Sequence, residues 1–390
     1  MNPKLEIQKI LLMQRIFFDN ASTTPLDEHV IEAMTVAMRN LYGNPSSIHA
    51  EGRQARAAIE QARKTVAHRL GASIGEIFFT SGGTESSNMV LKNAVRDLGV
   101  RRIISSRIEH HCVLHSVEAL ERQGLIRAEW VQLDAQGRVD MQHLKTLLQS
   151  SAEKTLVSLM HSNNEIGAMI DLPTVGALCR EHGALFHSDT VQTIGYFDFR
   201  LADWPVDFIT GSAHKFYGPK GTGFVYINSD CMLKPFVDGG GQERNMRGGT
   251  ENTAGIIGLA TALELAYDHL PERRAHITGL RDYLRTRIEQ AFPAARIYGD
   301  PDGGHYKLLN VGFPPTPRTD LLLLNLDIAG VSVSGGSACS SGADAGSHVV
   351  EALGGEPGWK AVRFSFSHHN TREEVDVVME KLKECLPRFT

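Results

Sequence analysis

A lysine and an aspartate each follow the end of a predicted strand. Lys215 lies in "GSAHKFYGPKG" after the β-branched run 206–212, and Asp189 ends the run "GALFHSD". Ligands of an open parallel sheet bind at the carboxyl ends of its strands, so we expect both side chains at one edge. Removal of water from around a lysine lowers its pKa, and the neutral amine can then form a covalent bond with a carbonyl group. A surface lysine and a helix-capping aspartate are the simpler alternatives.

A third strand end carries a glycine-rich turn. "SGGT", residues 81–84, follows the run "EIFFT" and precedes a helical pattern. Glycines let backbone N–H groups approach an anion, and a helix N-terminus adds positive potential. A plain strand-to-helix turn explains this segment equally well by itself. Together, a phosphate cradle, Asp189 and Lys215 fit pyridoxal phosphate, with the lysine as Schiff base and the aspartate beside the ring nitrogen.

A lone cysteine lies in a segment too small and polar to bury it. Cys339 is part of "VSVSGGSACSSGADAGS", residues 331–347. Structural cysteines are usually buried, whereas glycine and serine are typical of a solvated loop. The segment therefore indicates either a reactive thiol or an incidental loop cysteine.

These residues are expected on an α/β framework. Seven strands are predicted at 76–80, 102–106, 128–133, 155–160, 183–189, 206–212 and 222–228. Helical patterns cover 27–41, 49–70, 141–148 and 254–270, the second ended by Gly71 and the last stopped by Pro271. Strands alternating with helices predict a mostly parallel sheet. We expect an N-terminal arm at 1–26, a large domain at 27–262 and a smaller α+β domain at 263–390 that carries the 331–347 loop.

Composition is that of an ordinary globular protein. The 390 residues carry a net charge of −5, which does not suggest nucleic acid or an anionic membrane as a partner. The apolar patch Ile10–Met13 is too short for a signal peptide, so a cytoplasmic location is expected. Five scattered cysteines favour no disulfide framework. His111 and His115 with Cys112 make a small metal site conceivable, but a polar helix start without metal is favoured.

Seven motifs resemble those of the cysteine desulfurases among the class-V aminotransferases. They are "TSGGTESSN", "EHHCV", "HSNNEIG", "HSDTVQ", "SAHKFYGPKG", "GGGQERNMRGGTEN" and "SGGSACSSG". The resemblance extends from "FFDNASTTPLD" to "RFSFSHHNTREEVD". It implies a fold-type-I homodimer that uses pyridoxal 5′-phosphate, with a seven-stranded sheet in the large domain.

The resemblance also implies the catalytic residues. Lys215 would be the Schiff-base lysine, and Cys339 would accept the sulfur. Asp189 would hold the pyridine nitrogen. His110 would stack on the ring and move protons. The cysteines in no matching motif are expected to be passive; they are Cys112, Cys179, Cys231 and Cys385.

Further residues would bind the cofactor and the substrate. Gln192 and Asn164 would contact the O3′ side of the cofactor, and Asn164 would also face the substrate. The phosphate would be held by Gly83, Thr84, Ser212 and His214. Thr250 would reach the phosphate of the neighbouring subunit. Arg363 would clamp the substrate carboxylate, a bidentate task that suits a guanidinium.

The implied reaction moves sulfur from L-cysteine to Cys339 as a persulfide and releases L-alanine. An acceptor such as an iron–sulfur scaffold protein would then take the sulfur. Three alternatives stay open: a selenocysteine lyase or another β-eliminating lyase, an ordinary aminotransferase, and a sulfur-relay partner without enzymatic activity. A nucleotide-dependent dehydrogenase is disfavoured because the chain lacks the glycine fingerprint.

Overall fold

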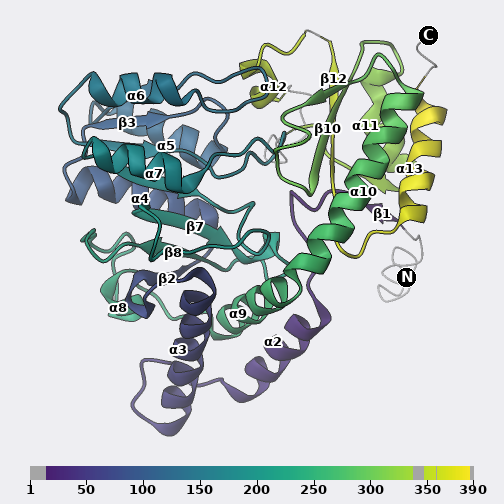
Figure 1. The fold of residues 1–390 in the computed structure, drawn as a ribbon. Coiled ribbons are helices and arrows are strands. Elements are labelled where there is room, and N and C mark those ends of the chain that lie inside the picture. The colour runs from purple at the N-terminus through teal and green to yellow at the C-terminus, as the bar shows by residue number, and fades with distance from the viewer. Residues whose placement is uncertain (1–14, 337–346, 357, 387–390) are drawn as a thin grey trace.

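A seven-stranded sheet forms the centre of the computed structural model, which describes residues 15–336, 347–356 and 358–386 (Figure 1). Its strand order is β2-β8-β7-β6-β5-β3-β4. The strands are β2 (Ile77–Thr80), β3 (Arg102–Ser105), β4 (Arg127–Trp130), β5 (Thr155–Ser158), β6 (Leu185–Asp189), β7 (Phe208–Ser212) and β8 (Gly223–Ile227). All pairs are parallel except those of β8, which runs antiparallel to β2 and β7. The predicted mostly parallel sheet is confirmed.

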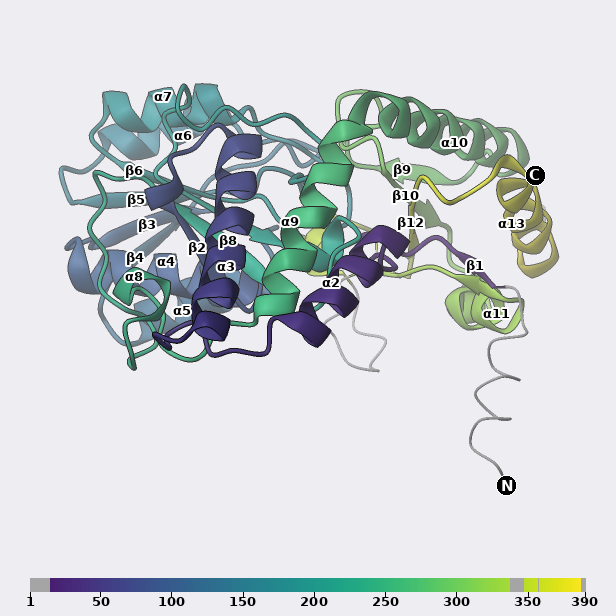
Figure 2. The ribbon, with the colours of Figure 1, turned by 90° about the horizontal axis from the view of Figure 1, so that it is seen from below.

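Helices cover both faces of this sheet, which explains why the residues of its central strands β5, β6 and β7 are almost all buried. Figure 2 shows α6 and α7 on one face and α4 and α5 on the other. The helices of the first group are α6 (Met141–Gln149) and α7 (Leu172–Glu181), and those of the second are α4 (Gly83–Asp97) and α5 (His111–Arg122). Two buried apolar clusters result, one on each face of the sheet.

Three further helices pack together beside the β2 edge of the sheet. They are α2 (Glu28–Asn40), α3 (Ala50–Leu70) and α9 (Thr253–Asp268). Gly71 ends α3 in a left-handed conformation with φ +62°, as a glycine at this position predicts. The prediction that Pro271 stops the helix expected at 254–270 is wrong. Helix α9 ends at Asp268, and Pro271 lies in the first turn of α10 (Leu270–Ala291), where its missing N–H costs no hydrogen bond.

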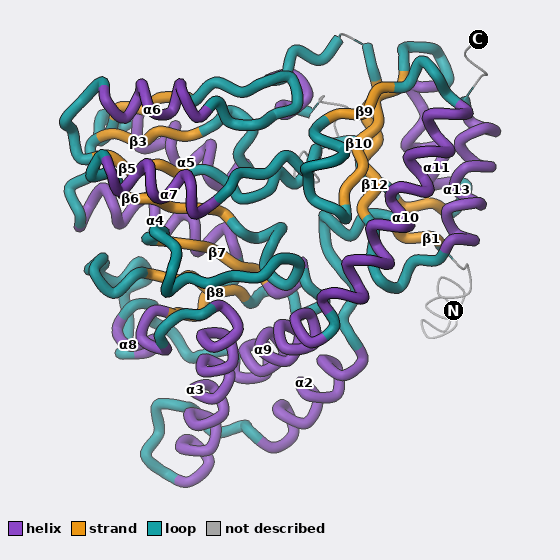
Figure 3. The backbone as a smooth tube through the Cα atoms, in the orientation of Figure 1, coloured by secondary structure: helices purple, strands orange, loops and turns teal. Residues whose placement is uncertain are grey.

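A second sheet follows in the C-terminal part of the chain. Its antiparallel order is β12-β10-β9, formed by β9 (Arg296–Tyr298), β10 (Leu308–Phe313) and β12 (Lys360–Ser365). Helices α10, α11 (Leu322–Ile328) and α13 (Arg372–Cys385) lie beside it, as the tube in Figure 3 also shows. The short elements are α8 (Gln242–Asn245), α12 (His348–Ala352), η1 (Ile74–Glu76), η2 (Ala213–Lys215) and η3 (Thr319–Leu321). The predicted boundary at residue 262 falls inside α9.

An N-terminal arm joins the two sheets. Strand β1 (Ile16–Phe17) pairs in parallel with β11 (Val331–Ser332). Phe18 is fully buried, with its ring centroid 5.0 Å from that of Phe366, whereas Phe17 is 37% exposed. The arm then reaches the large sheet, where the Thr24 N–H donates to the His214 carbonyl at 2.8 Å. Among the described helices, none has the length and apolarity needed to cross a membrane.

Candidate active site

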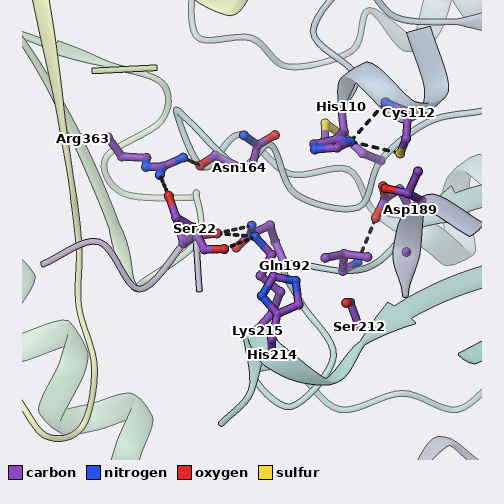
Figure 4. A pocket seen from close by; sticks show the side chains of 15 residues that line it. Ser22, His110, Cys112, Asn164, Asp189, Gln192, Ser212, His214, Lys215 and Arg363 are labelled. Carbon is purple, nitrogen blue, oxygen red and sulfur yellow. Dashed lines mark hydrogen bonds between the residues drawn. The ribbon is translucent and has the colours of Figure 1, made fainter. Parts of the chain in front are cut away.

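One pocket gathers ten of the twelve predicted site residues (Figure 4). These ten are Gly83, Thr84, His110, Asn164, Asp189, Gln192, Ser212, His214, Lys215 and Arg363. The pocket lies at the carboxyl ends of β6 and β7, where an open parallel sheet binds its ligands. Residues of the N-terminal arm and of β12 complete its wall.

Lys215 is held in the pocket by the backbone of the arm. Its Nζ donates to the carbonyl oxygens of Ala21 at 2.7 Å and Ser22 at 2.8 Å. Its own carbonyl accepts from the Tyr196 hydroxyl at 3.0 Å. These contacts fix the direction of the amine. Lys215 itself is the last residue of η2, which directly follows β7.

Asp189 is the last residue of β6 and is buried. Its Oδ1 accepts from the Val191 N–H at 2.9 Å. Burial raises the pKa of this carboxyl to about 6, although that N–H and the charge of Lys215 act in the opposite direction. The protein therefore compensates the charge of the Asp189 carboxylate only in part. A cationic group of a bound ligand beside Asp189 would supply the rest.

The N-terminus of α4 lines one part of the pocket. The helix begins at Gly83, where an added Cβ would lie 2.6 Å from Val191 Cγ2, so the close approach requires glycine. His214 also lines the pocket, with Nδ1 3.2 Å from Thr23 Oγ1. Burial and the charge of Lys215 lower the pKa of His214 to about 4. A neutral imidazole, the Ser212 hydroxyl and helix N–H groups suit a phosphate.

His110 is the N-cap residue of α5. Its Nδ1 accepts from the Cys112 N–H at 3.2 Å and lies 3.0 Å from Cys112 Sγ. Burial, followed by the charge of Lys215, lowers the pKa of His110 to about 4. Sequence reasoning missed that Cys112 lines the pocket. The signal was its place two residues after His110 in "EHHCV", at the start of a helix.

Arg363 reaches the pocket from β12 and is buried. Its Nη1 donates to the Asn164 carbonyl at 2.8 Å, while Nη2 donates to Ser22 Oγ at 2.7 Å and Asp19 Oδ1 at 2.8 Å. Gln192 Nε2 donates to the Ala21 carbonyl at 2.9 Å, and its buried Oε1 has no hydrogen-bond partner within the described ranges. Ser22 and Asp19 were not predicted, because their partner lies more than 340 residues away.

Two predicted residues are not among the ten that line this pocket. Thr250 is exposed and lines a second pocket with Glu243, Arg247 and Glu251. Cys339 lies outside the described residues. The conceivable metal site gains no support: the rings of His111 and His115 stack with centroids 5.0 Å apart, and the described part of the chain holds no metal-binding cluster.

Comparison with known proteins identifies the family of this chain. The Aminotransferase class-V family matches residues 16–378. Cysteine desulfurase IscS of Dictyoglomus turgidum is 38% identical over 382 residues, 97% of this chain and 96% of that protein. The chain belongs to the cysteine desulfurases of the class-V aminotransferase family.

Solved structures agree with this membership. A structure titled NifS-like protein superposes with a TM-score of 0.88 at 37% identity, covering 95% of this chain and 99% of that one. A second, titled "SspA in complex with cysteine", has a TM-score of 0.78 at 31% identity and covers 91% of this chain and all of that one. The fold and the family predicted from the seven motifs are confirmed, and the chain is a cysteine desulfurase by that membership.

Proposed function

We propose that this cysteine desulfurase takes sulfur from L-cysteine onto Cys339 as a persulfide and releases L-alanine. One observation carries the proposal: Lys215, Asp189, His110 and Arg363, from four separate parts of the chain, line a single pocket. Such a reaction requires an amine that reacts with carbonyl groups and a carboxylate that pairs with a ring cation. It also requires a proton-transfer group and a group that binds the substrate carboxylate. The structure titled with bound cysteine, 31% identical, supports L-cysteine as the substrate.

The pocket fits pyridoxal 5′-phosphate. The pKa of the buried Asp189, raised to about 6, indicates a carboxylate that lacks a full cationic partner, which a protonated pyridine nitrogen would supply. The buried Gln192 Oε1 lacks a partner among the described residues and would accept a hydrogen bond from the ring's substituents. Gly83 and Thr84 line the pocket at the N-terminus of α4, where helix N–H groups would hold a phosphate.

Each residue then has a defined task. The cofactor, when bound, withdraws electrons from the substrate's Cα. Lys215 takes the Cα proton with its Nζ, and Arg363 holds the carboxylate with two N–H donors. The Cys339 thiolate attacks the substrate sulfur, so an S–S bond forms as the Cβ–S bond breaks. The electron pair of the broken bond stays on Cβ, which takes up a proton, and return of a proton from Lys215 to Cα completes alanine. His110 donates a proton within this sequence.

The residues that flank the cysteine segment support a role beside the pocket. A Cβ built on Gly336 would lie 3.3 Å from Ser347 Cβ and 3.6 Å from Glu165 Oε2. The Ser347 hydroxyl donates to the same Glu165 oxygen. Glu165 directly follows the pocket residue Asn164, so both residues that flank 337–346 lie near the neighbour in sequence of a pocket residue.

Several expectations remain part of the proposal. We propose a homodimer in which Thr250 serves the partner's cofactor, a cytoplasmic location and a sulfur-acceptor protein such as an iron–sulfur scaffold. The division into an arm (1–26), a large domain (27–262) and a small domain (263–390) also belongs to it.

The experiment follows sulfide and alanine together when the purified yellow protein is given L-cysteine and dithiothreitol. Equal amounts of both products are expected, since the thiol reagent reduces the persulfide to sulfide. Pyruvate and ammonia in place of alanine would assign β-elimination instead. Formation of the cofactor's amine form with a need for a keto acid would assign an aminotransferase.

A further inference from the structure

The contact between Cys112 and His110 has a chemical consequence beyond packing. Two atoms of Cys112 face one ring nitrogen: the backbone nitrogen lies 3.2 Å from His110 Nδ1, and Sγ lies 3.0 Å from it. A backbone N–H can only donate, so Nδ1 is the acceptor and carries no proton. The neutral ring then carries its proton on Nε2.

The thiol is the second donor to the same nitrogen. An acceptor Nδ1 requires Sγ to donate, which it does as S–H. Burial raises the pKa of the Cys112 thiol far above its usual range, and the charges of Asp189 and Glu109 act in the same direction. The pair is therefore a thiol and a neutral imidazole, and not a thiolate–imidazolium ion pair. Cys112 is consequently no second nucleophile.

The charges around the ring keep it neutral as well. Lys215, His111, His348 and His115 all act against protonation of His110, from η2, from α5 itself and from α12. Rings of His111 and His348 lie with centroids 4.5 Å apart. A helix N-terminus also disfavours a cation at its cap. His110 thus enters the reaction able to give a proton from Nε2.

We propose that Cys112 is a positioning residue that holds His110 as the neutral Nε2–H tautomer, so that His110 gives the Nε2 proton in each turnover and regains one from water. This inference rests on the proposed proton-transfer role of His110. The thiol acts through His110 and not on the substrate. The thiol and the backbone N–H of Cys112 both donate to Nδ1 and so keep it unprotonated. The same two contacts keep the ring turned toward the start of α5.

The test uses holoenzyme with ¹⁵N in its histidine rings. The His110 signals, assigned by their absence in His110→Gln, are expected to show a protonated Nε2 and an unprotonated Nδ1 at neutral pH. A protonated Nδ1 would overturn the proposal. This measurement does not depend on turnover, so it separates the tautomer from the proposed reaction, which fails on its own if the wild-type enzyme releases no alanine.

The variants distinguish positioning from simple packing. Cys112→Ala removes one donor and is expected to raise the His110 pKa, and the acid limb of kcat with it, by about one pH unit. Cys112→Ser keeps a hydroxyl donor and is expected to stay near the wild-type profile. Cys385→Ala, a part-buried cysteine of α13 outside the pocket, is the control. Identical acid limbs in Cys112→Ala and wild type would contradict the positioning role.

Discussion

Arg363 Nη2 lies 2.8 Å from Asp19 Oδ1, a contact that joins β12 to the N-terminal arm. The same nitrogen donates to Ser22 Oγ, and Lys215 Nζ donates to the Ser22 carbonyl. Figure 4 shows Ser22 between the two cations. The arm therefore sets the distance between the group that is to bind the substrate's carboxylate and the group that is to act on its Cα.

Asp19→Asn weakens the orientation of Arg363 while leaving its charge in place. We expect KM for L-cysteine to rise about 10-fold with a smaller change in kcat, because the loss of one charge-assisted hydrogen bond is worth about 1.5–3 kcal/mol. Steady-state alanine release measures both constants. Asp327→Asn is a suitable control, since Asp327 pairs with Arg15 at the exposed end of the arm. A kcat loss with unchanged KM would contradict this assignment.

Arg363→Lys keeps a positive charge but loses the planar pair of donors. We expect kcat/KM for L-cysteine to fall about 100-fold, because a lysine cannot reproduce bidentate contact with a carboxylate. The comparison substrate is cysteamine, which has no carboxylate and whose turnover is expected to change little. Equal losses with both compounds would show that Arg363 acts on something other than the carboxylate.

Cys339→Ser replaces the proposed nucleophile with a poor one. Alanine formation from L-cysteine is expected to fall by about 1000-fold or more, since only a thiolate attacks sulfur at a useful rate. The visible absorption of the bound cofactor is expected to persist. Turnover in this variant at the parental rate would remove Cys339 from the mechanism and favour a selenocysteine lyase or another β-eliminating lyase.

Lys215 is expected to carry the cofactor covalently. Reduction of the holoenzyme with borohydride, followed by proteolysis and mass spectrometry, is expected to find the cofactor on the peptide containing Lys215. Lys220, five residues further along and exposed, is the internal control. Attachment at Lys220, or none at all, would disprove the proposed Schiff-base lysine.

Asp189 predicts an unusual dependence of stability on pH. Its folded pKa of about 6 exceeds the ordinary value of 3.8, so the cofactor-free protein loses stability as pH rises between these values and carries the full cost above pH 6. The cost is on the order of 2–3 kcal/mol.

Removal of the cofactor makes this visible. At pH 8, cofactor-free Asp189→Asn is expected to melt at a higher temperature than the cofactor-free parent, and at pH 4 the gap is expected to close. With cofactor added, the order is expected to reverse, because the parent regains its cationic partner. Calorimetry at both pH values measures this. A parent that outlasts the variant at pH 8 without cofactor would contradict the predicted cost.

Thr250 allows a test of the dimer by complementation. If it serves the partner's site, a heterodimer of Lys215→Ala and Thr250→Ala subunits contains one wild-type site and one doubly altered site. About half of the parental activity is expected from purified heterodimers carrying two different tags. Activity no higher than half that of the Thr250→Ala homodimer would show that Thr250 acts within its own subunit.

The large sheet was predictable because most of its strands are short β-branched or aromatic runs buried on both faces, as for the fully buried β5 (Thr155–Ser158). The pocket residues were predictable where they end such strands, as Asp189 and Ser212 do. Contacts that depend on the packing of distant segments were not. Asp19 meets Arg363 across 344 residues, and no local pattern announces such a pair.

The direction in which a side chain points was the second feature that could not be predicted from the sequence. Phe17 and Phe18 are adjacent and identical, yet only Phe18 is buried, because successive side chains of an extended segment point to opposite sides. Cys112 was expected to be passive, since a thiol near a helix start has no distinctive spacing. Its contact with His110 arises from the N-cap geometry of α5, which turns the ring back toward the first helical residues.

The arm holds Lys215 through two carbonyl oxygens, and every amino acid has a carbonyl oxygen. Side-chain replacement at Ala21 or Ser22 would therefore leave the acceptors of Lys215 in place and would not reveal their role; at Ser22 it would remove only the hydroxyl that contacts Arg363. Natural variation would hide them in the same way. Their importance would emerge only from changes to the backbone itself, such as deletion of one residue or replacement of a single peptide bond by an ester, which weakens the carbonyl as an acceptor.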